Sequence, residues 1–203
     1  ECSLWSPYWY INNNDDKTEL IIITTSETTS RQENIVINIG DSPIAPSAGP
    51  PRNLGVLFDS TCSLNEHVNK ICQTVNYQLY SIGKIRKYLD KPTTEKMINS
   101  AVTSRLDYCN SLLYGINGYS VSQLQRCQNN AARIVSLRRK YDHITPVLKE
   151  LHWLPVEQRI QYKILLLAYK AQHGMAPPYL SSLLSPYKPR RPLRSEGKHL
   201  LTT

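Results

Sequence analysis

The sequence predicts an α+β fold that is mainly α, with a few short β-strands at the N-terminus followed by a helical bundle. Short runs of β-branched residues are confined to the first 60 residues. From about residue 62 to residue 171, apolar residues recur at steps of three and four, which is the period of amphipathic helices. No apolar run approaches the ~20 residues of a membrane span, so we expect no membrane insertion.

The N-terminal part, residues 1–59, contains three predicted strands: "ELIIIT" at 19–24, "NIVINI" at 34–39 and "NLGVLFD" at 53–59. The connection "GDSPIAPSAGPPR" is expected to lack regular structure because of its glycines and prolines. Three strands need other elements to cover them, so this part is not expected to fold as an independent domain.

Residues 60–140 are predicted to form three helices. The second is expected to be capped by Thr93 or Thr94 and to continue to Gly115. The third should begin near Ser120 or Ser122. The inward stripe of the first helix is Leu64, Val68, Ile71, Val75, Leu79, Ile82, Ile85 and Leu89; that of the second is Ile98, Val102, Leu106, Cys109 and Leu113; that of the third is Leu124, Cys127, Ala131, Ile134 and Val135.

Residues 141–187 form a C-terminal helical region in the prediction. Pro146 and Pro155 each suit the first turn of a helix, and Gly174 ends the longer helix. A stripe of apolar residues marks that helix: Val156, Ile160, Ile164, Leu167 and Ala171. Residues 188–203 read as a basic, proline-rich tail without a core.

Charge is spread unevenly along the chain. Residues 1–60 carry three Lys/Arg and eight Asp/Glu, a net of −5, whereas residues 61–203 carry 21 Lys/Arg and eight Asp/Glu, a net of +13. Such a basic region is typical of a protein that binds a polyanion, most simply nucleic acid. A solvated basic surface would have the same composition.

The stretch "SRLDYCNSLLYG", residues 104–115, places an acid, a thiol and two phenols together. On one helix, Asp107 would point ~160° away from Cys109, so the two could not share a substrate. No histidine on this helix could activate the thiol. We therefore interpret Cys109 as a core residue and Asp107 as a cap or as the partner of a Lys or Arg on a neighbouring element.

Two other groups resemble metal sites. Asp15 and Asp16 could bind Mg²⁺, but their upstream flank is not a strand, and a polar turn is the preferred interpretation. Cys62, His67 and Cys72 have the spacing of three zinc-knuckle ligands, with Asp59 at the place of the first. A helical stripe runs through them and would spread the ligands around one helix, so no metal is predicted for this chain.

The five cysteines, Cys2, Cys62, Cys72, Cys109 and Cys127, are odd in number and irregularly spaced, and no CxxC motif is present. This pattern argues against a disulfide framework and favours a reducing compartment. We accordingly expect an intracellular protein, nuclear or cytoplasmic.

Several motifs occur together and in a definite order: "NDDKTE", "RNLGVLFD", "TSRLDYCNSLLYG", "LQRCQNNAARIV", the long segment "HITPVLKELHWLPVEQRIQYKILLLAYKAQHGMAPPYL", and "LRS". From Asn14 to Leu201 the chain resembles the C-terminal region of reverse transcriptases from non-LTR (LINE-type) retrotransposons, from the end of the palm through the thumb and beyond. Residues 1–11 depart from the family pattern.

The resemblance implies that residues 1–59 are a remnant of the polymerase palm and that residues 60–140 are the helical thumb. The Phe/Tyr-x-Asp-Asp box that binds the catalytic Mg²⁺ in the family is absent from this sequence, and Asp15 and Asp16 belong to a later motif. Lys17 is the only match to a family lysine that is a candidate proton donor to pyrophosphate. The chain is therefore expected to be a fragment that requires the missing N-terminal polymerase segments and has no enzyme activity or cofactor of its own.

The expected role is to bind the RNA/DNA template–primer. Arg126 and Arg133 are seven residues apart and share the face opposite Leu124 and Cys127; Arg138, Arg139 and Lys140 follow where the helix should end. We call these five residues the basic ridge. The alternative for the ridge is a solvated helix face. For the whole chain, the alternatives are a helical protein–protein interaction module or a retroelement remnant without function.

Overall fold

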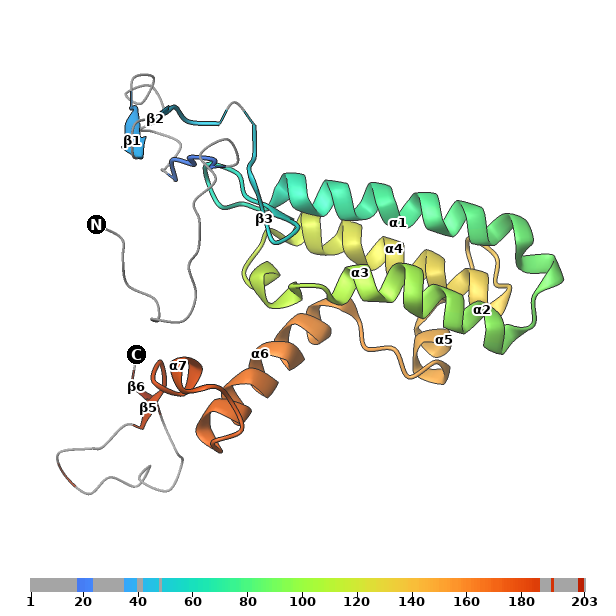
Figure 1. Ribbon diagram of the computed structural model, residues 1–203. Coiled ribbons are helices and arrows are strands. Elements are labelled where there is room, and N and C mark those ends of the chain that lie inside the picture. Colours follow the sequence, from blue (N-terminus) through green and yellow to red (C-terminus); the bar gives the residue numbers. More distant parts are fainter. Residues whose placement is uncertain are drawn as a thin grey trace. The chain divides into compact units, whose positions relative to one another are not determined.

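The computed structural model describes residues 18–23, 35–39, 42–47, 49–186, 191 and 201–202. It confirms an α+β, mainly α fold, with most of its helices between residues 65 and 172 (Figure 1). The chain divides into two compact units at residues 70 and 71, a boundary that α1 (Asn65–Ile85) crosses.

The strands of the first unit are shorter than predicted. β1 (Ile37–Ile39) pairs antiparallel with β2 (Ser42–Ile44), with Asn38 opposite Pro43. β2 lies in the connection predicted to be irregular, so that prediction was wrong. A proline is tolerated there because a two-stranded sheet consists only of edge strands. Within 18–23, only Leu20 pairs, through a single bridge to Pro46, and the ends of the predicted strands at Thr24 and Asn34 lie outside the described residues.

The predicted strand 53–59 is instead a tight hairpin. β3 (Arg52–Asn53) pairs with β4 (Val56–Leu57) across two residues of positive φ, Leu54 at 46° and Gly55 at 89°. Two successive positive φ values are typical of the type I′ turn, which matches the twist of a hairpin. The chain therefore reverses in the middle of the apolar run.

Helix α1 begins as predicted, and its buried face follows the predicted stripe from Leu64 to Ile82. The stripe does not continue beyond it. Ile85 is 41% exposed, whereas Arg86, at the start of the 3₁₀ helix η3 (Arg86–Tyr88), is only 9% exposed.

The second predicted helix is shorter and less regular than expected. It consists of α2 (Lys91–Ile98), a π-helical segment η4 (Asn99–Thr103) and α3 (Ser104–Asp107), and it is followed by the 3₁₀ helix η5 (Asn110–Leu113). Its N-cap is Asp90, and the expected caps Thr93 and Thr94 lie inside the first turn. Hydrogen bonding from the Thr93 side chain lowers the pKa of Asp90.

Helix α4 (Gly118–Ser136) lies at the centre of the second unit and packs against α2, η4, α5 (Thr145–Glu150) and α6 (Val156–Gln172). Its buried face is wider than the predicted stripe. It includes Ser120, Gln128 and Ala132 as well as Leu124, Cys127, Ala131 and Val135, whereas Ile134 is only half-buried. A helix that packs against four elements must bury more than one stripe.

The C-terminal helices begin and end close to the prolines and the glycine that were predicted to bound them. Pro146 lies in the first turn of α5, and Pro155 is the N-cap of α6. Gly174, at φ 67°, follows α6, and α7 (Pro178–Ser181) comes next. β5 (Ser185–Pro186) pairs with β6 (Leu201–Thr202), while most of the basic tail between them lies outside the described residues.

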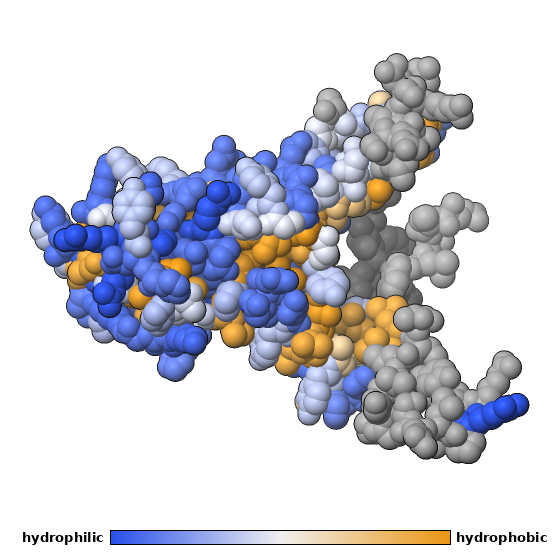
Figure 2. All heavy atoms as spheres, turned by 180° about the vertical axis from the view of Figure 1, so that it is seen from behind, coloured by the Kyte–Doolittle hydropathy of each residue, from blue (hydrophilic) through white to orange (hydrophobic). Residues whose placement is uncertain are grey.

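Apolar residues remain exposed on the later part of α6 and beyond it. Val156, Ile160 and Ala171 of the predicted stripe are buried, but Ile164 is half-buried and Leu167 is 36% exposed. Hydrophobic residues gather toward the end of the helical part where α6 lies, while hydrophilic residues cover much of the rest (Figure 2). Among the described residues, no helix combines the length and apolar character needed to cross a membrane.

Candidate nucleic-acid interface

Helix α4, which carries Arg126 and Arg133 of the basic ridge, is fixed at its N-terminal end by a side-chain cap. The Asn117 carboxamide oxygen accepts a hydrogen bond from the Ser120 amide at 2.8 Å. Near the middle, Gln128 is 2% exposed and donates to the Leu154 carbonyl oxygen at 2.8 Å. The Gln128 contact joins α4 to the turn before α6, so Gln128 faces the interior.

Arg126 and Arg133 differ in their exposure. Arg126 is exposed, and its guanidinium carbon lies 5.9 Å from the centre of the Tyr119 ring. Arg133 is half-buried, and its Nε has no hydrogen-bond partner among the described residues. Their positions two turns apart correspond to ~10 Å along the helix axis. That spacing matches about three steps of a B-form strand, which rises ~3.4 Å per nucleotide.

The C-terminal end of α4 presents the rest of the ridge. Leu137 adopts the left-handed conformation, at φ 54° and ψ 35°, and the Arg138 amide donates to the Arg133 carbonyl oxygen at 3.1 Å. A hydrogen bond from an amide to the carbonyl oxygen five residues earlier is the 6→1 bond of a Schellman motif. Glycine usually occupies the left-handed position of that motif, which is Leu137 here. Arg138, Arg139 and Lys140 follow, and all three are exposed. The helix therefore ends in a basic loop, as predicted.

Two acidic residues lie near this loop. The Asp142 carboxylate accepts a hydrogen bond from the backbone amide of Arg139 at 2.9 Å. This contact does not involve the Arg139 guanidinium group. Glu150 is paired with Lys91, and the hydrogen bond from Lys91 and its charge lower the pKa of Glu150, with a smaller contribution from Arg138. The loop keeps a net positive charge.

A second basic surface was missed by the sequence analysis. Lys84 Nζ lies 4.3 Å from the centre of the Tyr80 ring, and Lys87 Nζ lies 4.7 Å from that of Tyr88. The two tyrosines are 64% and 76% exposed. The signal for this surface was present in the sequence, because no Asp or Glu occurs between Glu66 and Asp90. Exposed aromatic rings beside cations are typical of surfaces that bind nucleic acid.

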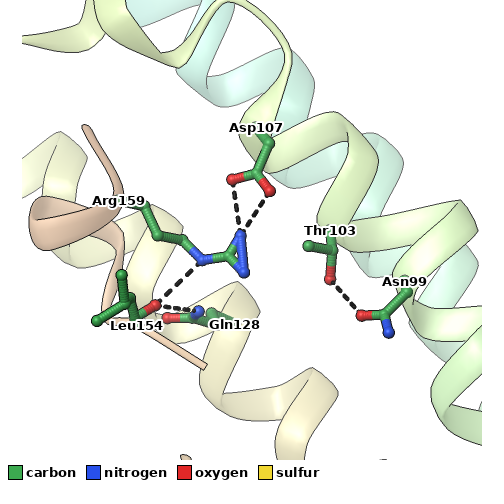
Figure 3. Close-up of polar contacts among 6 residues, drawn as sticks. All are labelled: Asn99, Thr103, Asp107, Gln128, Leu154 and Arg159. Atoms are coloured by element: carbon green, nitrogen blue, oxygen red, sulfur yellow. Dashed lines mark hydrogen bonds and ion pairs between the residues drawn. The ribbon is translucent and has the colours of Figure 1, made fainter. Parts of the chain in front are cut away.

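Asp107 has the structural role predicted for it. Arg159 of α6 donates from Nη1 to both Asp107 carboxylate oxygens, at 2.6 and 2.7 Å, and from Nε to the Leu154 carbonyl oxygen at 3.1 Å (Figure 3). Figure 3 shows Gln128 approaching the same carbonyl group. These contacts connect the end of α3 to α4 and α6.

Cys109 does not lie in the middle of a helix, so that prediction was wrong. The helix ends at Asp107, Tyr108 is extended, and Cys109 is left-handed at φ 51°. The ion pair of Asp107 and the packing of η5 against α6 outweigh the local preference for helix. Cys109 is half-buried rather than part of the core.

Asp59, at the place of the first zinc-knuckle ligand, instead organises the turn before α1. It accepts hydrogen bonds from the Thr61 hydroxyl, the Ser63 hydroxyl and amide, and the Leu64 amide, at 2.7 to 3.0 Å. Burial would raise the pKa of Asp59, but these hydrogen bonds outweigh it and lower the pKa to about 2.

His67 and Cys72 likewise have contacts of their own. His67 is buried, which lowers its pKa, and its Nδ1 accepts a hydrogen bond from the Leu57 amide at 3.4 Å. The interaction with the neighbouring Cys127 lowers the pKa of the Cys72 thiol, and the same interaction together with burial raises the pKa of Cys127. In the described part of the chain, no three His, Cys, Asp or Glu side chains form a group that could hold a metal ion.

Asp15, Asp16 and Lys17 lie outside the described residues, so their predicted roles stay predictions. Comparisons of the chain with protein-family models, with curated proteins and with solved structures found no match.

Proposed function

We propose that this chain is the nucleic-acid-holding region of a LINE-type reverse transcriptase and that it binds the template–primer duplex through the basic ridge. The observation that carries the proposal is the exposed position of Arg126 on the solvent face of α4 together with the exposed basic loop, residues 138–140, at the end of the same helix. The order of the sequence motifs and the charge of residues 61–203 support the same conclusion.

The ridge would act through phosphate groups. Arginine and lysine side chains spaced along a helix can each neutralise a phosphate and release a counterion, and such contacts position a duplex without reading its bases. We therefore propose binding that is independent of sequence and steeply dependent on salt. The hydrogen bond from Gln128 to the Leu154 carbonyl oxygen would hold α4, and with it the ridge, in place against the duplex backbone.

We propose no polymerase chemistry for this chain on its own. Phosphoryl transfer with two metal ions requires a pair of carboxylates to hold them, and the family box that supplies these carboxylates is absent from the sequence. Missing N-terminal segments would supply the active site, with Mg²⁺ as its cofactor.

The test is a titration of a fluorescently labelled RNA/DNA primer–template with the purified chain at several salt concentrations. The proposal predicts saturable binding whose logarithmic affinity falls by ~0.9 per log unit of salt for each phosphate neutralised on B-form DNA, with the same trend for RNA-containing duplexes. Binding that is absent at low salt, or independent of salt, would contradict it.

A second candidate function, a helical protein–protein interaction module, is favoured by the exposed apolar residues of α6 and the segment after it. Leu165, Met175 and Leu183 are 68%, 57% and 72% exposed. Exposed apolar side chains of this size are found at protein interaction sites when they form a patch. This function predicts that Leu165→Gln with Leu183→Gln leaves duplex affinity unchanged and reduces self-association or partner binding in sedimentation experiments.

A further inference from the structure

A cleft of about 300 Å³ lies between the end of α3, the turn before α6 and the first half of α6. The polar side chains that line it are those of Asp107, Asn110, His152, Arg159, Tyr162 and Lys163. Leu154 and Leu166 supply apolar wall. Its volume is at the lower end of the range of small-molecule sites.

Asn110 is the feature of this cleft that packing does not explain. The residue is 4% exposed, and its Oδ1 is shielded from water and has no hydrogen-bond partner among the described residues. An unsatisfied buried polar group costs about 1–3 kcal/mol, and natural proteins keep few of them. The last torsion of an asparagine side chain is broad, so the carboxamide can rotate to offer its oxygen to a donor on a ligand.

Arg159 offers a fixed donor at the same place. Its Nε and Nη1 are engaged by Leu154 and Asp107, and its side chain is 18% exposed. No hydrogen bond within the described residues uses its Nη2. The exposed Lys163, one helical turn further along α6, adds a second cation to the rim of the cleft. Together with Asp107, these groups leave a net charge of about +1, which suits a ligand with one anionic end.

We propose that the cleft binds a single unstacked nucleotide, with its phosphate at Arg159 and Lys163 and its base edge at Asn110. Base edges carry the N–H groups and acceptors that a carboxamide can pair with, and unstacked bases are held in proteins between apolar and aromatic side chains. Tyr162, Leu154 and Leu166 provide such walls. The assignment of a nucleotide rests on the proposed nucleic-acid function, but the cleft is separate from the basic ridge.

The experiment titrates the full chain with AMP, GMP, CMP and UMP by calorimetry, with ribose 5-phosphate and inorganic phosphate as probes of the anionic end alone. We expect saturable binding of at least one nucleotide, at least tenfold tighter than ribose 5-phosphate. Equal affinity for the nucleotides and ribose 5-phosphate, or no saturable binding of any nucleotide, overturns the proposal.

Two variants test the residues. Lys163→Gln should weaken nucleotide binding about tenfold, whereas Lys170→Gln, seven residues later on the same side of α6 and outside the cleft lining, should leave it unchanged. Asn110→Leu should also weaken binding about tenfold while the melting temperature stays the same or rises, because an apolar side chain of similar size removes the unsatisfied oxygen. Nucleotide affinity that is unchanged in either Lys163→Gln or Asn110→Leu contradicts the proposal.

The ridge variant Arg126→Gln, Arg133→Gln and Arg139→Gln separates this proposal from the proposed function. Nucleotide binding should persist in it even where duplex binding is lost. Loss of nucleotide binding in that variant, with its melting temperature unchanged, would contradict the assignment to a separate cleft. Duplex binding without nucleotide binding by the parent chain would refute the cleft alone.

Discussion

The Arg86 guanidinium donates a hydrogen bond from Nη2 to the carbonyl oxygen of Val135, 49 residues further along the chain, at 2.9 Å. Its Nε donates to the Ile134 carbonyl oxygen at 2.8 Å, and its Nη1 donates to the Leu89 carbonyl oxygen at 2.6 Å. The first two acceptors belong to the last turn of α4, where carbonyl groups have no partner within the helix and the helix dipole favours a cation. One buried arginine therefore connects the end of α1 to the end of α4.

Replacing Arg86 should be strongly destabilising. Arg86→Met keeps the long apolar stem but leaves buried carbonyl oxygens without donors, so we expect the free energy of unfolding in urea to fall by about 2–4 kcal/mol. Lys84→Met, two residues earlier and exposed, is the matched control and should lower it by no more than about 0.5–1 kcal/mol, the value of its exposed cation–π contact with Tyr80. Equal effects of the two substitutions would show that the guanidinium contacts do not stabilise the fold.

Leu137 is expected to be a position where glycine stabilises. A left-handed conformation costs a residue with a Cβ roughly 1–2 kcal/mol, and Leu137 is 70% exposed, so little packing is lost with its side chain. Glycine loses more conformational entropy on folding than leucine does, which offsets part of this gain. Leu137→Gly should therefore raise the free energy of unfolding by about 1 kcal/mol. Leu137→Ala retains the Cβ and should not. A loss of stability in the glycine variant would contradict this account of the Schellman turn.

The lowered pKa of Asp59 leads us to expect a specific dependence of the unfolding free energy on pH. Because its folded pKa of about 2 lies below the ordinary value of 3.8, its contribution is fully present above about pH 4 and is lost as the pH falls toward 2. The shift corresponds to about 2 kcal/mol at most, and partial solvent exposure reduces this to about 1 kcal/mol. The difference in unfolding free energy between the parent and Asp59→Asn should therefore shrink over this pH range. A difference that is constant with pH would exclude this role for Asp59.

Primer extension by the purified chain on an RNA template should be undetectable with Mg²⁺ or Mn²⁺, because the metal-binding box is missing from the sequence. Gel analysis of labelled primer is sufficient to check this. Reproducible incorporation that disappears in the Asp15→Ala, Asp16→Ala variant would refute our interpretation of that pair as a polar turn.

The helical part of the fold could be predicted because burial on a helix repeats every three to four residues. The positions from Leu64 to Ile82 and from Val156 to Ile160 follow that repeat and are buried. The contacts that end or join helices have no such repeat. Arg86 is buried where Ile85 was expected to be, because its guanidinium caps the end of α4. Helix α3 ends at Asp107, which forms an ion pair with Arg159. Neither partnership has a local signal in the sequence.

Of the two candidate sites, only the one that lies along a single helix could be predicted from the sequence. The exposed ridge could be placed from helical spacing alone, although spacing did not reveal that Arg133 is half-buried. The cleft at Asn110 could not be placed, because its walls come from segments about 50 residues apart that meet only in the folded chain.

Salt-dependent duplex binding by the ridge variant tests the central claim most directly. We expect Arg126→Gln, Arg133→Gln and Arg139→Gln to flatten the slope of log affinity against log salt by about two to three units, and to weaken all sequences alike. The control Lys96→Gln, Lys170→Gln and Arg191→Gln removes the same charge from exposed positions outside the ridge and should leave most of the slope. If the ridge variant binds a primer–template duplex as tightly as the parent at every salt concentration, while the melting temperatures are the same, the ridge is only a solvated helix face.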